Sequence, residues 1–317
     1  MRILITGGFG LIGGRLAQHF SNRGHHVILG SRKVNDSRVY QNLEVEVLQT
    51  CWNDMNKLIN ICSGVDVIIH TAGMNAQDCA NDFVAALMTN GLATASILSA
   101  AINQNVRKFL YFSTAHVYNS SLVGIINETN CPKNFHPYAT SHRAGEDVVI
   151  AAHRENLIEG VVLRLSNGFG APIHPGVNCW MLLVNNLCRQ AVETKRVVLK
   201  TNGLQMRNFI PLQEICYAVD FIIQSPIQQK CKEAAGLINL GSNKSVSVLE
   251  MALLIQSRCK MILGFEPKLI CGSQNFDKNN SELDYRIDNL RNMGYDPTIE
   301  PHQEIDNLLI YCFNNFG

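Results

Sequence analysis

Short runs of consecutive apolar residues alternate with longer segments of helical periodicity through the first half of the chain. Strands that are buried on both faces read as unbroken apolar runs, so this alternation predicts a parallel sheet with helices on both sides. Right-handed crossovers then give an α/β fold of the doubly wound type. The predicted strands are residues 2–6, 27–30, 44–48, 66–70, 108–112 and 160–164, and the longest predicted helices are residues 82–101 and 139–155.

The pattern loosens after residue 165, where a loop-rich stretch contains Pro172 and Pro175. Beyond it we predict a strand at residues 237–240 and a helix at residues 246–256, without strict alternation. We therefore expect a doubly wound domain over residues 1–165 and a smaller C-terminal lobe over residues 166–317. The lobe would close a cleft over the carboxyl edge of the sheet, and the strand near 237–240 is a candidate to return to that sheet.

The first predicted strand runs directly into a glycine-rich turn, and a helical segment follows to about residue 23. Its three glycines are spaced three apart: the first permits a sharp turn, the second the close approach of a pyrophosphate, and the third close packing of helix on strand. A helix N-terminus offers N–H groups and a positive dipole end to an anion. This context predicts a Rossmann-type dinucleotide site more than a plain turn, with the binding residues Gly7, Gly10, Leu11, Ile12 and Gly13.

The end of the second predicted strand bears on the choice of dinucleotide. An acidic residue usually stands there and binds the ribose hydroxyls of NAD. Here the strand ends in Ser31, Arg32 and Lys33, without a carboxylate. Cations and a hydroxyl would stabilise a 2′-phosphate, so Ser31 and Arg32 favour NADP, with NAD and a merely solvated basic turn as alternatives.

Composition adds few constraints, but it disfavours some classes of function. There are 27 Lys and Arg against 26 Asp and Glu, and a net charge of +1 favours neither nucleic acid nor a membrane surface. The 11 cysteines are scattered and never spaced C-x-x-C, which argues against a zinc site or a disulfide framework and for reduced thiols in a cytoplasmic protein. We expect no segment long enough to span a bilayer and no metal site.

Two further segments carry groups that suit proton transfer. Thr114 follows the fifth predicted strand, in the sequence Phe-Ser-Thr-Ala-His-Val-Tyr. Tyr138 opens a predicted helix, and His142 lies one turn later on the same helical face. With these segments in view, the chain resembles the extended short-chain dehydrogenase/reductase superfamily, and within it the NAD-dependent epimerase/dehydratase group that acts on nucleotide sugars.

The resemblance covers nearly the whole chain and implies further site residues. They lie in a turn after the fourth strand, in the family's fourth helix, and in two later segments that contact the nucleotide sugar. The implied cofactor-binding residues are Thr71, Ala72, Gly73 and Asn90, and the implied substrate-binding residues are Asn167 and Arg207.

In the family, a tyrosine exchanges a proton with the reacting sugar hydroxyl, and a serine or threonine orients the oxygen. By position, the resemblance assigns these roles to Tyr138 and Thr114. A phenol has a pKa of about 10, and it must be shifted toward neutral to act as a base. In the family a lysine four residues after the tyrosine causes this shift and also binds the nicotinamide ribose, whereas this chain has His142 there.

Three interpretations of His142 remain open at this stage. A protonated imidazole could do the work of the lysine, another cation such as Arg143 or Lys133 could replace it, or the site could be slow or silent. A neutral imidazole would still bind a ribose hydroxyl, but it would lower the phenol pKa less. We therefore assign catalytic roles to Thr114, Tyr138 and His142, with Tyr138 and His142 also contacting the cofactor.

Sugar 4,6-dehydratases have Thr-Asp-Glu where this chain has Thr114-Ala115-His116, so the resemblance disfavours dehydration. The prediction is an NAD(P)-dependent enzyme of a nucleoside-diphosphate sugar that reduces a 4-keto group or epimerises C4. The alternative is a non-catalytic NADP-binding sensor or partner protein on the same scaffold. The family also implies a homodimer formed through the two long helices.

Overall fold

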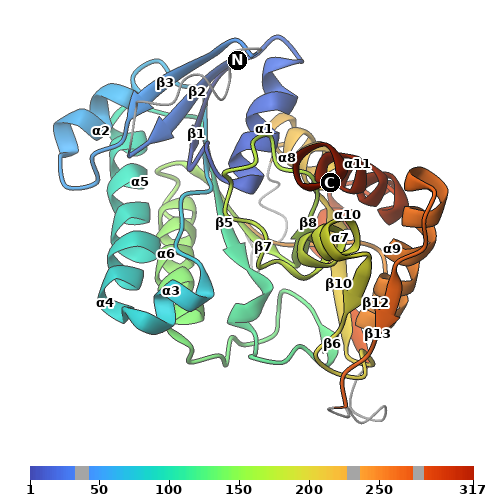
Figure 1. The fold of residues 1–317 in the computed structure, drawn as a ribbon. Helices are drawn as coiled ribbons and strands as arrows, with labels where there is room; N and C mark the ends of the chain where they lie inside the picture. The colour runs from blue at the N-terminus through green and yellow to red at the C-terminus, as the bar shows by residue number, and fades with distance from the viewer. Residues whose placement is uncertain (33–42, 227–235, 274–281) are drawn as a thin grey trace.

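The computed structural model describes residues 1–32, 43–226, 236–273 and 282–317. A seven-stranded parallel sheet forms its centre, in the order β11-β7-β5-β4-β1-β2-β3 (Figure 1). The doubly wound α/β fold is therefore confirmed. The strands of the sheet are β1 (Arg2–Thr6), β2 (His26–Ser31), β3 (Val45–Gln49), β4 (Val67–His70), β5 (Lys108–Thr114), β7 (Glu159–Leu165) and β11 (Leu237–Leu240).

Alternate residues of each strand face opposite layers of helices, as the pleat of a strand requires. In β1, Ile3 and Ile5 pack in the core beneath α1 and α8, whereas Leu4 packs in the core beneath α2, α5 and α6. Both faces of the sheet are thus buried, which explains the continuous apolar runs. The helices of the two layers are α1 (Leu11–Ser21), α2 (Met55–Cys62), α5 (Ala93–Asn103), α6 (Pro137–Arg154) and α8 (Leu212–Gln224).

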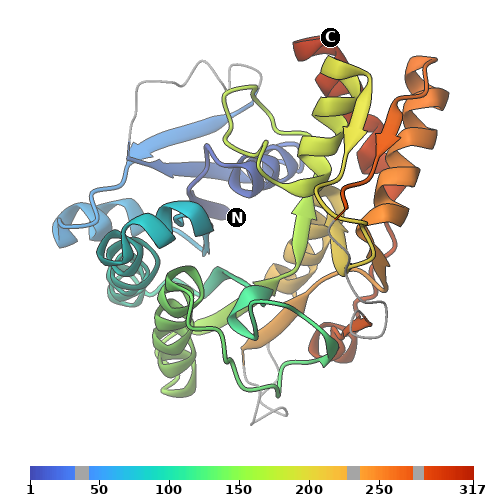
Figure 2. The ribbon, with the colours of Figure 1, turned by 60° about the horizontal axis from the view of Figure 1, so that its bottom comes forward.

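Most of the elements after β7 gather on one side of the sheet (Figure 2). Helices α7, α9 and α11 surround a separate apolar core. The remaining elements are α3 (Ala76–Asn81), α4 (Phe83–Ala86), η2 (Leu87–Leu92), η3 (Ala115–Val117), β6 (Gly124–Ile126), β8 (Asn167–Phe169), α7 (Leu183–Thr194), β9 (Arg196–Val198), β10 (Met206–Pro211), β12 (Ser245–Ser247), α9 (Val248–Leu263), β13 (Lys268–Ile270), β14 (Leu283–Tyr285), α10 (Asp288–Asn292) and α11 (Pro301–Phe316).

The later part of the chain contributes to both regions. Strand β11 pairs with β7 at the edge of the large sheet, with Leu237 opposite Val162. Helix α8 packs into the core on one face of that sheet. A division into residues 1–165 and 166–317 therefore stays a prediction, and the two parts share one sheet.

The predicted helix at residues 82–101 is longer than expected. It runs as α4, η2 and α5 from Phe83 to Asn103, through a turn of π-helix at Leu87–Leu92. By length and composition this helix could cross a membrane, so our expectation that no segment is long enough is wrong. Such a helix is weak evidence for a membrane, since core helices of other proteins pass the same test.

Candidate active site

The turn between β1 and α1 is built from glycines that no other residue could replace without movement. Gly7 has a φ of +69°, and a Cβ there would lie 2.7 Å from the amide nitrogen of Ala72. A Cβ at Gly13 would lie 2.5 Å from the carbonyl oxygen of Gly7, so α1 packs directly on the turn. Among the described residues, no side chain caps the N-terminus of α1 and no acid lies in its first turn. The helix thus presents a positive end at the edge of the sheet.

A cleft of about 610 Å³, here named the glycine-turn cleft, opens beside this helix end. It contains most residues that the sequence predicted for the cofactor. Arg32 is exposed at its rim, whereas Lys33 lies outside the described residues. The predicted residues that line it are Gly7, Gly10, Leu11, Ser31, Arg32, Thr71, Ala72 and Gly73.

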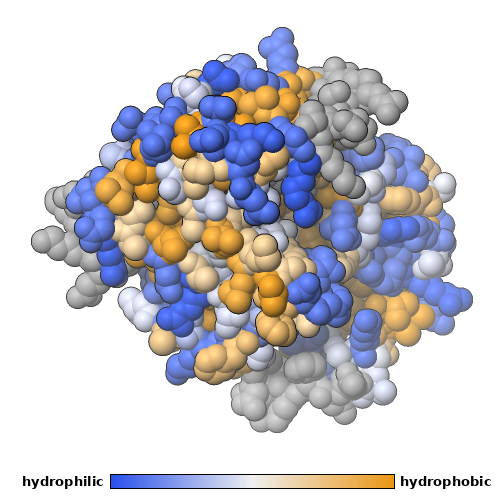
Figure 3. All heavy atoms as spheres, turned by 90° about the vertical axis from the view of Figure 1, so that its left-hand side faces the viewer, coloured by the Kyte–Doolittle hydropathy of each residue, from blue (hydrophilic) through white to orange (hydrophobic). Residues whose placement is uncertain are grey.

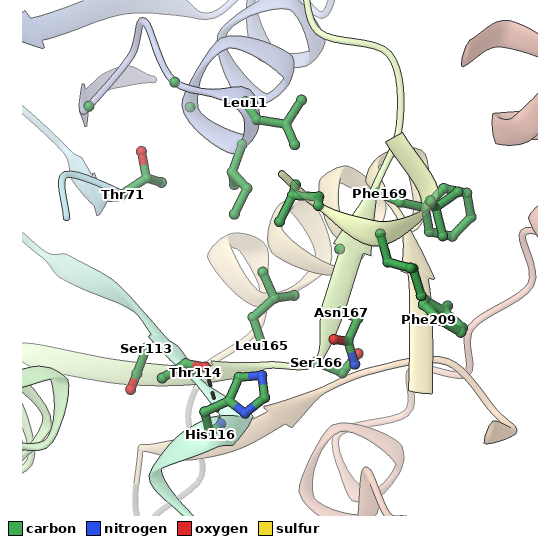
Figure 4. Close-up of a pocket in the computed structure, with 18 of the residues that line it drawn as sticks. Leu11, Thr71, Ser113, Thr114, His116, Leu165, Ser166, Asn167, Phe169 and Phe209 are labelled. Atoms are coloured by element: carbon green, nitrogen blue, oxygen red, sulfur yellow. Dashed lines mark hydrogen bonds between the residues drawn. The ribbon is translucent and has the colours of Figure 1, made fainter. Parts of the chain in front are cut away.

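A second cavity of about 310 Å³, named the Tyr138 cavity, shares Gly7, Gly10, Leu11 and Thr71 with this cleft. Ile12 and Gly13 lie on its wall. Figure 4 shows Thr114 and His116 on one side of it, and Ser166, Asn167 and Phe209 opposite. These groups come from the carboxyl ends of β5 and β7 and from β8 and β10. The cavity thus brings Thr114 and Tyr138 beside the glycine turn.

Thr114 and Tyr138 meet in this cavity, as the sequence predicted. Burial raises the pKa of Tyr138, and a hydrogen bond with the Thr114 side chain partly opposes the rise. The phenol is therefore protonated near neutral pH in the free protein. The Thr114 hydroxyl also accepts a hydrogen bond from the backbone N–H of His116, at 3.1 Å, which fixes its orientation.

His142 lies behind the cavity rather than on its wall. Its ring is 4.6 Å from the Tyr138 ring, centroid to centroid, in an edge-to-face contact. Burial lowers the pKa of His142 to about 4, so the ring is uncharged near neutral pH and does not supply the charge of the lysine. Of the two cations that we considered, Arg143 is exposed and contacts Asp147, and Lys133 is exposed.

The other predicted residues have different surroundings. Asn90 is fully buried, where its Oδ1 accepts from the Met74 N–H at 2.8 Å and its Nδ2 donates to Ser141. It therefore supports the floor of the glycine-turn cleft. Asn167 lines the Tyr138 cavity and donates to the Asn208 carbonyl at 2.9 Å. Arg207 is half-buried in β10.

His116 is a cavity residue to which our sequence analysis assigned no role. Burial lowers its pKa, and the positive charge of Arg207 lowers it further, so His116 is a neutral imidazole that can accept a proton. The signal in the sequence that could have identified His116 as a site residue is its position directly after a predicted strand. Further wall residues that the sequence analysis missed are Ser166, Phe169, Leu183 and Phe209 in the cavity, and Phe9, Trp52, Met74 and Asp78 in the cleft.

Within the part of the chain that the structure describes, no group of three His, Cys, Asp or Glu side chains is arranged to hold a metal ion.

The sequence pattern of the NAD dependent epimerase/dehydratase family matches residues 3–241. The chain belongs to this family. The match spans the glycine turn, the Tyr138 cavity and all seven strands of the large sheet.

The chain is similar to proteins with several activities. The dTDP-D-glucose 4,6-dehydratase of Bos taurus is 27% identical over 267 residues, which are 79% of this chain and 71% of that protein. The UDP-glucuronic acid 4-epimerase from Bacillus cereus, solved in complex with UDP-glucuronic acid and NAD, has a TM-score of 0.78 at 21% identity, covering 99% of both chains. The NAD-dependent NDP-hexosamine 5,6-dehydratase TunA has a TM-score of 0.79 at 21% identity, covering 98% and 97%.

The prediction of a reductase or epimerase, with 4,6-dehydration disfavoured, is contradicted by these relatives. Dehydratases of this name from cow, Streptomyces niveus and Dictyostelium discoideum all match the chain, and TunA is a dehydratase as well. The prediction relied on Ala115 and His116 in a single tripeptide. Water elimination needs a proton acceptor and a proton donor at the right places in a cavity, and side chains from any wall can meet that need.

Proposed function

We propose that this chain is an enzyme that oxidises C4 of a nucleoside-diphosphate sugar, with NAD or NADP bound in the glycine-turn cleft. Oxidation to a 4-keto sugar precedes both 4,6-dehydration and C4 epimerisation, so the proposal covers the activities of the relatives named above. The observation that carries it is the meeting of Tyr138 and Thr114 in one cavity beside the glycine turn.

The residues present fit a dinucleotide. Gly7 and Gly13 let the turn pack closely against Ala72 and the start of α1, Gly10 lines both the cleft and the cavity, and the N–H groups of α1 suit a pyrophosphate. When bound, the cofactor supplies the acceptor for the hydrogen and electron pair from C4. Arg32 and Ser31 remain our reason to propose a preference for NADP. In calorimetry, Arg32→Ala should weaken NADP about tenfold and change NAD little, whereas equal native affinities would contradict the preference.

In the proposed reaction, the deprotonated Tyr138 takes the proton from the sugar O4, and Thr114 holds that oxygen by a hydrogen bond. The O4–H bond breaks as the C4=O bond forms, and the phenol returns the proton if the keto group is reduced again. Because burial keeps the phenol protonated at neutral pH, oxidation should accelerate as pH rises.

The substrate would lie in the Tyr138 cavity, with the diphosphate toward β10. Arg207 provides a charge there, and Asn167 and Ser166 provide polar groups. The side-chain oxygen of Ser166 is buried without a hydrogen-bond partner, and a sugar hydroxyl would satisfy it.

The experiment is incubation of the purified protein with NAD or NADP and a panel of UDP- and dTDP-sugars, followed by chromatography and mass spectrometry. Loss of one water identifies dehydration, and an isomer of equal mass identifies epimerisation. Conversion of at least one sugar supports the proposal. Tight binding of the dinucleotide without conversion of any sugar contradicts it and favours the non-catalytic sensor or partner protein.

We further propose that the active form is a homodimer that pairs the helix Phe83–Asn103. Five apolar side chains of this helix are about half exposed or more, and they recur at helical spacing: Phe83, Val84, Leu87, Met88 and Leu92. Figure 3 shows the face that carries α2 to α5, where apolar side chains gather among polar ones. A second copy of the chain would bury these five side chains, whereas in a monomer they would remain in contact with water.

Native mass measurement tests the dimer. The double change Leu87→Glu and Leu92→Glu should convert a dimer to a monomer. The matched control is Met261→Glu, which alters another well-exposed apolar residue, on α9, and should leave the mass unchanged. A native protein that is monomeric at micromolar concentration would contradict this proposal.

A further inference from the structure

A column of three rings is buried directly behind the Tyr138 cavity. His70 at the end of β4, Tyr111 in β5 and His142 in α6 stack, with successive ring centroids 5.7 and 5.9 Å apart. His70 and Tyr111 are fully buried, and His142 is nearly so. Tyr111 has no role in the proposed function, yet it contacts the residue that replaces the family's lysine.

The Tyr111 hydroxyl has one hydrogen and three acceptors within 3.5 Å of its oxygen, and the Thr94 side chain also interacts with it. Burial raises the pKa of Tyr111 well above 10, so the phenol keeps its hydrogen. Its oxygen lies 2.9 Å from Nδ1 of His142, but 3.3 Å from the Asn90 carbonyl and 3.4 Å from the His142 carbonyl. The Asn90 carbonyl already accepts from Thr94 at 2.7 Å. Donation to Nδ1 is therefore the strongest of the three bonds.

This bond determines which nitrogen of His142 carries the proton. A neutral imidazole has one N–H, and the nitrogen that accepts a hydrogen bond is the other one. The proton then lies on Nε2. That edge of the ring faces Gly73, where an added Cβ would lie 3.6 Å from Cε1 and 3.8 Å from Nε2. Since Gly73 lines the glycine-turn cleft, Nε2 lies directly behind the wall of that cleft.

Gly145 gives independent support for the importance of the phenol. It lies inside helix α6, where glycine is less favourable than alanine. A Cβ at this position would lie only 2.6 Å from the Tyr111 oxygen and 2.7 Å from the Asn90 carbonyl oxygen. The helix thus has its smallest residue where the hydroxyl and this carbonyl need space.

We propose that Tyr111 is a positioning residue, which holds His142 as the tautomer that donates from Nε2 to an oxygen of the bound dinucleotide. The identity of the recipient rests on the proposed function, whereas the tautomer does not. A lysine needs no such partner, since its ammonium group donates in any orientation. The exchange of lysine for histidine therefore makes binding dependent on a residue of β5.

Two measurements test this proposal. Two-bond ¹H–¹⁵N spectra of the histidine rings identify the tautomer in the protein without cofactor, with His142→Ala to assign the signals. The native protein should show a single Nε2–H form, and Tyr111→Phe should give a mixture. Calorimetry should show that Tyr111→Phe binds the dinucleotide about two- to tenfold more weakly than the native protein. The lower limit corresponds to half-population of the Nε2–H tautomer, and the upper limit to the loss of one hydrogen bond.

The matched control is Tyr285→Phe, which removes another buried phenolic hydroxyl, one that donates to the Arg164 carbonyl at 2.6 Å. It should leave the His142 signals and the affinity unchanged. A mixed or Nδ1–H tautomer in the native protein would overturn the proposal without any variant. A pure Nε2–H form and native affinity in Tyr111→Phe would overturn it too. Native protein that binds no dinucleotide, but shows the expected tautomers, would refute the proposed function and the recipient while leaving the tautomer assignment supported.

Discussion

Helix α6 has two buried polar groups on the same face, one turn apart, and the protein treats them in opposite ways. His142 is uncharged, with its Nδ1 bonded to a neutral phenol. Glu146 forms a two-pronged ion pair with Arg164, at 3.0 and 2.7 Å, and accepts from Ser113 at 2.5 Å. Tyr138 begins this series, at positions i, i+4 and i+8.

The difference shows where the fold tolerates charge. At Glu146 the carboxylate and guanidinium neutralise each other, and the Arg164 side chain also lies 4.6 Å above the Tyr118 ring. At His142 burial opposes the charged form, and the ring remains neutral next to the phenol. Tyr138, the proposed proton carrier, thus has a neutral neighbour, in contrast to the lysine that the resemblance implies.

The largest effect should come from removing the proton carrier itself. Tyr138→Phe keeps the ring contact with His142 and removes only the hydroxyl. We expect the rate to fall by about 10²–10⁴-fold, as loss of acid–base catalysis does, with dinucleotide affinity retained. Steady-state rates beside Tyr285→Phe provide the comparison, and a native rate in Tyr138→Phe would refute the site.

Breaking the ion pair between Glu146 and Arg164 should mainly affect the stability of the fold. Glu146→Gln leaves the buried Arg164 guanidinium without its counter-charge, and we expect about 3–5 kcal/mol less unfolding free energy. The control Glu46→Gln disrupts the half-exposed pair with Arg2 and should change it by less than about 1 kcal/mol. Denaturant titrations measure both, and equal effects would contradict the contrast between the sites.

The uncharged His142 should make the free energy of unfolding depend on pH. His142 has a pKa of about 4 in the folded protein and about 6.5 when unfolded, so the unfolded chain binds more protons between these values. Stability is then lost as pH falls below about 6.5, by about 2 kcal/mol down to pH 5. His142→Gln has no imidazole at this position to protonate. The unfolding free energy of the native protein, measured relative to this variant, should therefore fall by that amount over the same pH range. A pH-independent difference between the two proteins would show that His142 titrates normally.

Replacing His142 by a cation should have the smallest effect. His142→Lys puts a positive charge one turn from Tyr138, and we expect it to lower the phenol pKa by about one unit. The rising limb of the pH–rate profile should move to lower pH by the same amount. His142→Gln is the neutral control, and an unmoved limb in the lysine variant would mean that charge at this position does not reach the phenol.

Much of the fold was predictable because the signals are local. Continuous apolar runs gave the strands, and the glycine spacing gave the turn beside β1. The bounds of the helix from α4 to α5 were predicted within two residues, but its π-helical turn at Leu87–Leu92 was not predicted.

The candidate site was only partly predictable. Thr114 and Tyr138 follow element ends, where ligand sites of such folds gather, and they do share a cavity. In the sequence, Tyr111 is not distinguishable from the other apolar residues of its strand. Its contact with His142 depends on how β5 packs under α6, which the sequence pattern does not show. The pKa of His142 depends on burial by distant segments, which spacing along the chain does not reveal.

The most direct test of the account is transfer of the C4 hydrogen. A sugar that is converted in the panel above would be prepared with deuterium at C4 and mixed rapidly with native protein and dinucleotide. We predict transient absorbance of reduced nicotinamide, formed more slowly from the deuterated sugar and absent on this timescale in Tyr138→Phe. Conversion of the sugar without reduced nicotinamide and without an isotope effect would contradict oxidation at C4.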